Sequence, residues 1–387
     1  MKVVHIVGER FDDAVSGATL RNSAINAALT ATHETLTIFV SDLCQTEKGF
    51  PTRTDAYIAA SFPAYLLDEI SRQVVAFGAD VAVVEGVFMH DVAERLKTED
   101  VAVIVDAHNH ETALLRQIDR AELPFPIRSF APLLKRKRWQ LAAEAERRLA
   151  QMASDIWVCS EQDRAGMANA FGSDVPIHVL PNPMPAWCLG EPERPDRSIP
   201  PDGIRAIFVG HLGYRPNKDA VRSLLNRIMP AIRRRFPHAT IAICGRAPNR
   251  RIVRRAAGTD WVRLVASPPD LRPCYRDANL VLVPLKTGGG TRIKVLEALA
   301  LGLPVIATAK AVEGIGLVHD EHYLCAESPG DYLEAVTRLV EEPETLLRLR
   351  GNGRRFVEKH HSQKIIELRV AALLAEFAER REAMTHG

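Results

Sequence analysis

At 387 residues the chain is long enough for two or three domains of ordinary size, ~150 residues each. Its composition, 47% hydrophobic and 25% charged, is typical of a globular protein, and no stretch approaches the ~18 uninterrupted apolar residues of a membrane-spanning helix. The net charge of +2 hides two basic stretches: residues 205–263 carry 14 Lys or Arg against two Asp, and residues 128–148 carry seven against two Glu. Such stretches indicate either an anionic partner or a solvated basic face.

The first half of the chain alternates strand and helix patterns. Buried-strand patterns occupy residues 2–7, 32–42, 79–86, 101–109 and 155–163, and helical patterns occupy 19–31, 64–77, 92–97, 138–153 and a segment that Ser160 caps. This alternation predicts a parallel, doubly wound sheet. The six cysteines form no C-x-x-C pair, so neither a disulfide framework nor a zinc site is indicated.

Seven prolines between residues 181 and 201 predict a linker. The alternation then restarts, with strands at 204–210, 239–245, 261–266, 279–285 and 303–308, and helices that include 218–235, 293–301, 344–360 and 363–382. We therefore expect two Rossmann-like α/β domains that face each other across a cleft: 1–183, then a linker at 184–203, then 204–362. Ligands of such sheets bind beyond the carboxyl ends of the strands.

A glycine-rich loop opens the helix at 293–301 and contains Gly288, Gly289, Gly290 and Thr291. Free N–H groups at a helix start bind anions, and Arg292 and Lys294 in the first turn would be unfavourable there without one. Glu297, one turn later, could accept hydrogen bonds from two vicinal hydroxyls. The alternative is a tight turn with a surface Lys–Glu pair. The pattern is neither a P-loop nor G-x-G-x-x-G.

Three further loops follow strands. Gly210 and Gly213 make a turn from which Arg215 and Lys218 could reach a phosphate, and Gly17 precedes another helix start. His108 and His110 follow a strand of the first half, but alternate residues point in opposite directions and no further ligands are evident, so a metal site is not favoured. His108 is the candidate for a direct substrate contact.

The segments VLPNPMP, IFVGHLGYRPNKDAV and ANLVLVPLKTGGGTRIKVLEALALGLPVIATAKAVEGI resemble the C-terminal half of GT-B glycosyltransferases of family 4. VCSEQDRAGM extends the resemblance upstream, and DAHNHE and SGATLRN extend it more weakly. The resemblance implies a retaining, metal-independent, hexosyltransferase-type enzyme that uses a nucleotide-diphosphate sugar and no cofactor. Its basic residues would stabilise the leaving diphosphate.

The resemblance also implies residue roles. Glu297 would bind the ribose, Arg292 and Lys294 would lie near the diphosphate, Gly17 near the donor phosphate and acceptor, and His108 against the transferred sugar. The helix at 363–382 would return to the first domain. Two positions depart from the pattern. Gly289 replaces the first glutamate of Glu-x7-Glu, as in a subgroup with GGGTR, and His211 replaces an arginine, so Arg215 or Lys218 must supply that charge.

The function expected is sugar transfer to a glycan or lipid-linked acceptor in the synthesis of a cell-surface polysaccharide or glycolipid. We expect a cytoplasmic protein, with peripheral membrane association if the basic helix around 135–152 docks on acidic lipid and does not merely pack the first domain. The alternatives are a non-catalytic nucleotide-sugar-binding partner, suggested by Gly289, and an epimerase or phosphorylase, which would need carboxylates or a pyridoxal-bearing lysine. Nucleic-acid binding is not expected, because the aromatics of the basic stretch are scattered.

Overall fold

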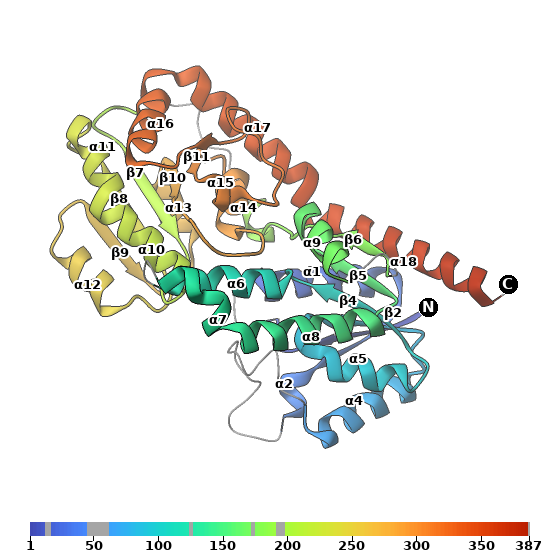
Figure 1. The fold of residues 1–387 in the computed structure, drawn as a ribbon. Helices are drawn as coiled ribbons and strands as arrows, with labels where there is room; N and C mark the ends of the chain where they lie inside the picture. The colour runs from blue at the N-terminus through green and yellow to red at the C-terminus, as the bar shows by residue number, and fades with distance from the viewer. Residues whose placement is uncertain (12–16, 45–61, 124–126, 172–174, 191–197, 386–387) are drawn as a thin grey trace. The chain divides into compact units, whose positions relative to one another are not determined.

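The computed structural model describes residues 1–11, 17–44, 62–123, 127–171, 175–190 and 198–385. The chain divides into two compact units, one comprising Met1–Pro183 with Gln363–Gly387 and the other Met184–Ser362. Each unit is built on a parallel six-stranded sheet with helices on its faces (Figure 1). Two Rossmann-like α/β domains were predicted, and this prediction is confirmed.

The sheet of the first unit has the order β2-β1-β3-β4-β5-β6, and all neighbouring strands are parallel. Of its six strands, the four central ones are almost fully buried, as expected for a parallel sheet covered on both faces, and the two edge strands are partly buried. The strands are β1 (Lys2–Val7), β2 (Glu34–Phe39), β3 (Val81–Glu85), β4 (Ala102–Ala107), β5 (Asp155–Val158) and β6 (Ile177–Val179). The chain adds β2 on one side of β1 and the later strands on the other side, beginning with β3. The strand order therefore reverses between β1 and β3, and the carboxyl ends of these two strands form the switch point of the first unit.

Helices cover both faces of this sheet. They are α1 (Gly17–Thr32), α2 (Val40–Leu43), α4 (Ala64–Phe77), the 3-10 turn η1 (Val87–Met89), α5 (His90–Lys97), α6 (Glu111–Glu122), the 3-10 turn η2 (Ile127–Phe130), α7 (Ala131–Leu134), α8 (Arg136–Met152), α9 (Glu161–Phe171) and α18 (Gln363–Thr385). Of these, α2, η1, α6, η2 and α7 were not predicted, and the predicted strand that ran to residue 42 ends at Phe39, where α2 follows. The buried face of α6 carries Thr112 and Asp119 beside Leu115, and these polar residues interrupt the apolar periodicity that would reveal a helix.

The last helix of the chain, α18, belongs to the first unit, as the resemblance implied. It packs along α1, and Ile366, Val370 and Leu374 join Ile25 and Leu29 in one buried cluster. Its Arg380 also donates to the fully buried carboxylate of Asp155 at 2.6 Å.

The sheet of the second unit has the order β12-β11-β10-β7-β8-β9, again parallel throughout. The strands are β7 (Arg205–Val209), β8 (Thr240–Gly245), β9 (Val262–Ala266), β10 (Leu280–Val283), β11 (Val305–Ala307) and the two-residue β12 (Leu324–Cys325), which was not predicted. Read from β9, this is the 3-2-1-4-5-6 order of dinucleotide-binding folds, whose ligands bind where the order reverses. In this unit that point lies between β7 and β10.

The helices of the second unit are η3 (Ala186–Cys188, 3-10), α10 (Arg215–Ser223), α11 (Met229–Arg235), α12 (Arg250–Ala257), α13 (Arg272–Asp277), α14 (Ile293–Ala300), α15 (Ala309–Val312), α16 (Pro329–Glu341) and α17 (Pro343–His361). The single helix predicted at 218–235 is α10 and α11 joined by a π-helical turn, η4 (Leu224–Ile228). Pro230 accounts for the turn, since it lacks an N–H and its ring crowds the carbonyl four residues earlier.

The segment at 184–203 differs from the predicted linker. Met184, Cys188 and Ile199 are buried in the core of the second unit, and the segment is counted within that unit. Proline richness therefore marked an irregular stretch that packs on a core. None of the helices described has the length and apolar character needed to cross a membrane.

Candidate functional site

The second unit brings two of the predicted loops together at its switch point. The turn that begins at Gly210 follows β7, and the glycine-rich loop follows β10. Backbones approach closely here: a Cβ on Gly245, which has φ +146°, would lie 1.8 Å from the carbonyl oxygen of Gly210. A Cβ on Gly210 would in turn lie 2.7 Å from Nζ of Lys294. Gly245 must therefore be glycine for the end of β8 to lie so close to Gly210.

Lys294 connects the two loops. From the first turn of α14 its Nζ donates to Oδ1 of Asn217 at 2.8 Å, and it lies 4.4 Å from the ring centroid of Phe208. Burial lowers the pKa of Lys294 to about 7; Glu297 opposes this shift and Arg292 adds to it. An ammonium with one neutral hydrogen-bond acceptor in a partly dehydrated position is suited to bind an anion.

Arg292, which was predicted to lie near the diphosphate, is held by the backbone of the glycine-rich loop. Its guanidinium is buried and donates to the carbonyl oxygens of Gly288, at 2.8 Å, and Gly290. Gly288 and Gly290 have φ of +122° and +67°, which other residues rarely adopt. In this structure Arg292 therefore holds the shape of the loop, while Gly289 is exposed and Thr291 half-buried.

Glu297 lies on the buried side of α14. Its Oε2 accepts a hydrogen bond from the Tyr275 hydroxyl at 2.6 Å, and Tyr275 itself is 1% exposed. Burial raises the pKa of Glu297, although Tyr275 and Lys294 oppose the shift. Tyr275 was not singled out from the sequence; it fixes one carboxylate oxygen and so orients the other.

The cations near the β7 turn differ in their surroundings. Arg215 is exposed and donates to Asp219 at 2.8 Å, so this predicted phosphate contact is engaged in a surface ion pair. Lys218 is half-buried, and together with Arg246 it lowers the pKa of His211 beyond the effect of burial. Gly213 lies against the His211 ring, with its Cβ position 3.1 Å from the ring carbon Cε1. Lys218 rather than Arg215 thus supplies positive charge beside His211.

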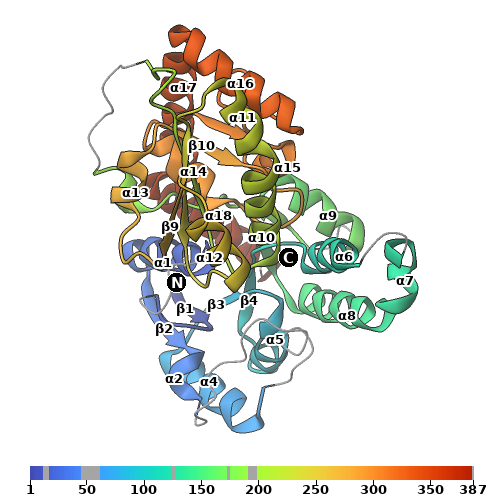
Figure 2. The same cartoon turned by 90° about the vertical axis from the view of Figure 1, so that its left-hand side faces the viewer.

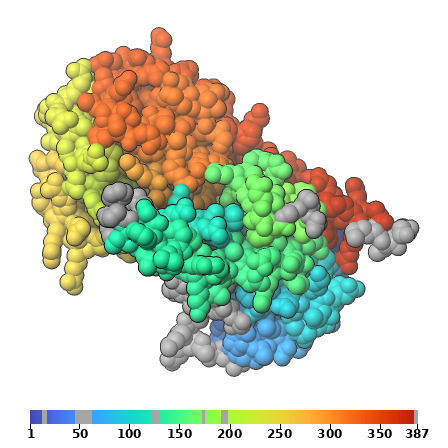
Figure 3. All heavy atoms as spheres, in the orientation of Figure 1, coloured from blue at the N-terminus to red at the C-terminus, as the bar shows by residue number. Residues whose placement is uncertain are grey.

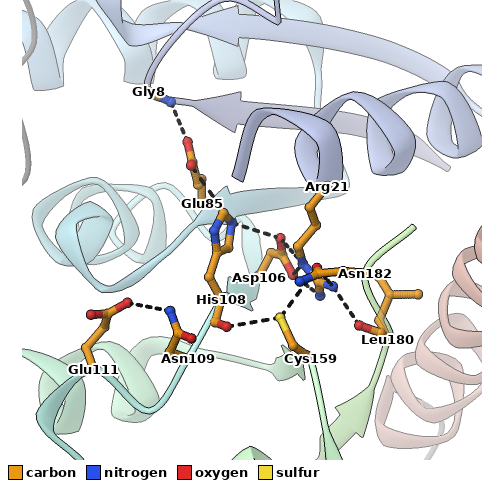
Figure 4. Close-up of polar contacts among 10 residues, drawn as sticks. All are labelled: Gly8, Arg21, Glu85, Asp106, His108, Asn109, Glu111, Cys159, Leu180 and Asn182. Carbon is orange, nitrogen blue, oxygen red and sulfur yellow. Dashed lines mark hydrogen bonds and ion pairs between the residues drawn. The ribbon is translucent and has the colours of Figure 1, made fainter. Parts of the chain in front are cut away.

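In the first unit a buried polar cluster lies at the carboxyl end of β4 (Figure 4). Arg21 reaches from α1 to Asp106 at 2.5 Å, and both side chains are 1% exposed. The guanidinium also donates to the Leu180 carbonyl at 2.6 Å and to Oδ1 of Asn182 at 2.9 Å. Burial raises the pKa of Asp106, but Arg21 and His108 lower it more, so the net shift is downward.

His108 is held beside this pair. Its Nε2 lies 3.4 Å from Oδ2 of Asp106 and 3.8 Å from Oε1 of Glu85 (Figure 4). Glu85 ends β3 and accepts a hydrogen bond from the Gly8 N–H at 2.8 Å, which ties the ends of β1 and β3. His108 therefore lies at the switch point of the first unit. Gly17 begins α1, and the residues before it, 12–16, lie outside the described part.

Behind His108 lies a small cavity of about 20 Å³, large enough for one water molecule, lined in part by Asn109, Glu111 and Glu146. Glu146, on α8, accepts from the Thr112 N–H at 3.2 Å while its other oxygen has no partner. Burial raises the pKa of Glu146 to about 7, opposed by Thr112. The cavity thus pairs a buried carboxyl of raised pKa with the loop that carries His108.

The two histidines considered for a metal are directed to different partners, since His110 lies 3.7 Å from Glu146. Among the residues described, no three His, Cys, Asp or Glu side chains are grouped as metal ligands would be. Whether the reaction needs a metal stays a prediction.

Arg21 was missed by sequence reasoning although a signal was present. It lies at i−3, i−4, i−7 and i−8 from Ala24, Ile25, Ala28 and Leu29, which are the apolar residues of the buried face of α1. A charged residue on such a face requires a partner, and Asp106, inside an apolar strand, is the matching anion.

Residues 203–342 match the family model described as "Glycosyl transferases group 1". The matched residues lie wholly within the second unit, Met184–Ser362. The match covers the β7 turn, the glycine-rich loop and α14, which are the elements of the switch-point site.

A curated relative, an uncharacterized 44.6 kDa protein in the cps region of Klebsiella pneumoniae, is 24% identical over 166 residues. That match spans 41% of this chain and 42% of the relative, so it covers less than half of either.

Solved structures show the same fold across the whole chain. Sucrose-phosphate synthase from Thermosynechococcus elongatus superposes with a TM-score of 0.72 at 18% identity, covering 98% of this chain and 99% of the other. The Anabaena protein HepE in complex with UDP-glucose gives a TM-score of 0.63 at 12% identity, over 97% and 100%. TarM gives 0.60 at 13%, over 81% and 58%. The region that matches the group 1 model is thus part of a GT-B fold.

Proposed function

We propose that the protein is a retaining glycosyltransferase of the GGGTR subgroup of family 4, which transfers a sugar from a nucleotide-diphosphate donor to a glycan or lipid-linked acceptor. The observation that carries the proposal is Lys294, held between the β7 turn and the glycine-rich loop at the switch point of a group 1 domain. HepE, which has the same fold, is described in complex with UDP-glucose, and this supports a nucleotide-sugar donor.

In this proposal the donor diphosphate binds at the start of α14. The helix N-terminus and Lys294 stabilise the negative charge that develops as the glycosidic bond to the diphosphate breaks. Glu297, oriented by Tyr275, accepts hydrogen bonds from the ribose hydroxyls with its other oxygen. Arg292 keeps the loop in the conformation that exposes its N–H groups.

The acceptor and transferred sugar lie, in this proposal, against the first unit, with His108 as the contact to the sugar. The Asp106 and Glu85 carboxylates lie beside Nε2 of His108, and they favour an imidazole ring that is held in one orientation and able to donate a hydrogen bond. The relative from the cps region supports a role in polysaccharide synthesis. No metal is required, because fixed cations and N–H groups provide the charge stabilisation.

The test is thermal unfolding of the purified chain with nucleoside diphosphates and their sugars in EDTA. A ligand at ~100 times its Kd adds about 2.7 kcal/mol to the stability of the folded state. We expect a shift with one base, lost in Lys294→Met and kept in Arg215→Gln, which removes an exposed cation nearby. No shift with any nucleotide would refute the donor site.

Turnover separates the enzyme from a non-catalytic binding partner, the alternative that Gly289 suggests. The donor for this experiment is the nucleotide sugar that stabilises the chain in thermal unfolding. NMR of the product should show that the anomeric configuration of the donor is retained. Binding without transfer or donor hydrolysis would favour the binding partner, and an inverted product would exclude the retaining mechanism.

A further inference from the structure

An exposed apolar surface lies at one end of the first unit, where η2, α7 and the start of α8 follow one another. Of the 14 large hydrophobic side chains that are exposed among the described residues, five fall between residues 127 and 141. They are Ile127 (45% exposed), Phe130 (60%), Leu133 (74%), Leu134 (59%) and Leu141 (47%). Scattered apolar side chains are normal on a protein surface, but a concentration of this kind marks a binding surface.

The surface rests on a fixed base. Phe130, Leu133 and Leu134 follow helical spacing and so share one face, while Ala131 between them is fully buried. Ala131 packs with Leu115, Trp139 and Ala142 in a small cluster separate from the main cores. Figure 2 shows α7 where α6 and α8 end, away from the strands, and Figure 3 shows this part of the chain at the surface.

Cations surround the apolar side chains. Lys135, Arg136 and Lys137 follow α7 directly, and the last two are exposed. On α6, the exposed Arg116 and Arg120 lie over the ring of Trp139, 5.8 and 5.6 Å from its centroid.

The nearby acid is already neutralised. Asp119 is fully buried and accepts from Arg138 and from Trp139 Nε1, the latter at 2.7 Å. In the described part of the chain no carboxylate forms an ion pair with Arg116, Arg120 or Arg136. These three arginines, with Leu133 and Trp139, line an open hollow of about 540 Å³.

We propose that this surface docks on a lipid bilayer that contains anionic phospholipids. Phe130, Leu133 and Leu134 enter the boundary between headgroups and acyl chains, and Arg116, Arg120 and Arg136 bind a lipid phosphate in the hollow. Apolar side chains ringed by Lys and Arg, with no unpaired acid described among them, match the two attractions that hold proteins at such membranes. A second copy of the chain fits less well, because two equally basic surfaces would repel each other.

The experiment is flotation of the full chain with vesicles of phosphatidylcholine alone or with ~30% phosphatidylglycerol, at low and high salt. We expect binding to the anionic vesicles only. Replacing Phe130, Leu133 and Leu134 together by Ser should lower the partition coefficient at least ~10-fold. Replacing Arg116, Arg120 and Arg136 together by Gln should remove the preference for anionic lipid.

Two control variants carry substitutions of the same kinds at exposed positions outside this surface. Leu347→Ser with Leu368→Ser alters exposed leucines on α17 and α18, and Arg254→Gln with Arg255→Gln alters exposed arginines on α12; both should bind as the unchanged chain does. Circular dichroism and thermal unfolding verify that each variant is folded.

Three results would overturn the proposal: no binding of the unchanged chain to anionic vesicles, full binding by the serine variant, or equal losses in the controls. Light scattering that shows a dimer dissociated by Leu133→Ser would assign the surface to self-association instead. Because no sugar transfer is measured, failure here leaves the proposed activity untouched.

Discussion

At the scale of single residues, the Arg21–Asp106 pair stands out because both side chains are buried. Removing one charge from a buried pair leaves the other uncompensated, at a cost of about 3–5 kcal/mol. We predict this loss for Asp106→Asn, and a smaller loss for Arg21→Met combined with Asp106→Leu. Urea unfolding measures both.

The control is Asp277→Asn, which breaks the exposed pair with Arg263 and should cost under ~1 kcal/mol. Equal losses for the two single variants would show that the buried pair has no special weight. Arg21 also shows what the sequence could have revealed: helical spacing places it on an apolar face, whereas nothing in the sequence indicates that Leu180 and Asn182 complete its hydrogen bonds.

Lys294 predicts the pH dependence of donor binding. Its pKa of about 7 means that it is mostly neutral above pH ~8, and a diphosphate that binds there must then recruit a proton. The Kd of a nucleotide sugar, whose phosphates do not titrate near neutrality, should rise up to ~10-fold per pH unit between pH ~7.5 and ~9. His211 does not interfere, because its pKa is lowered below this window.

Calorimetry across this window measures the effect. Lys294→Arg keeps its charge at every pH and should abolish the dependence, whatever its absolute affinity. An affinity of the unchanged chain that stays constant over the window would mean that Lys294 does not titrate on binding.

At the scale of elements, Glu146 on α8 makes the stability of the first unit depend on pH. Glu146 has a folded-state pKa of about 7 against an ordinary 4.5, so the folded state holds its proton more tightly than the unfolded state. This stabilisation is complete below pH ~4.5 and is lost as the pH rises through 7. Glu146→Gln, which mimics the protonated form, should therefore gain about 3 kcal/mol at pH ~8 and nothing near pH ~4.5.

Chemical unfolding at the two pH values measures the difference. Glu144→Gln is the matched control on the same helix, since Glu144 is exposed and paired with Arg147; it should change stability little at either pH. A Gln variant at 146 that is equally stable to the unchanged chain at both pH values would contradict a buried, protonated carboxyl.

Elements differ in how far the sequence predicts them. Continuous apolar runs such as Val81–Glu85 and Leu280–Val283 identify central strands because both faces are buried. The glycines before α14 predict where this helix starts, because the loop that precedes it needs backbone conformations that other residues rarely adopt. Gly288 and Gly290 have these conformations, with positive φ. Short or mixed elements such as α7 and β12 carry too few residues for any periodicity, and their positions depend on tertiary packing.

At the scale of the whole molecule, the chain crosses between its units twice, after Pro183 and after Ser362. The first unit is therefore discontinuous in sequence, and its cluster around α1 and α18 needs both pieces. The first crossing lies where the first domain was predicted to end, but the proline-rich segment that follows it belongs partly to a core. The resemblance rather than the residue pattern predicted the second crossing.

The second unit is continuous, with its own core and all the residues assigned to the donor site except Gly17. We predict that residues 184–362 alone unfold cooperatively on heating and are stabilised by the same nucleotide as the full chain, because Lys294, Glu297 and the β7 turn remain together. Residues 1–183 alone should lack a cooperative transition, since Ile25 and Leu29 lose the cover of α18. A peptide of residues 363–385 should restore that transition in calorimetry. If the isolated second unit folds but no longer responds to the nucleotide that stabilises the full chain, the donor site must include residues of the first unit, and Gly17 is then the first position to change.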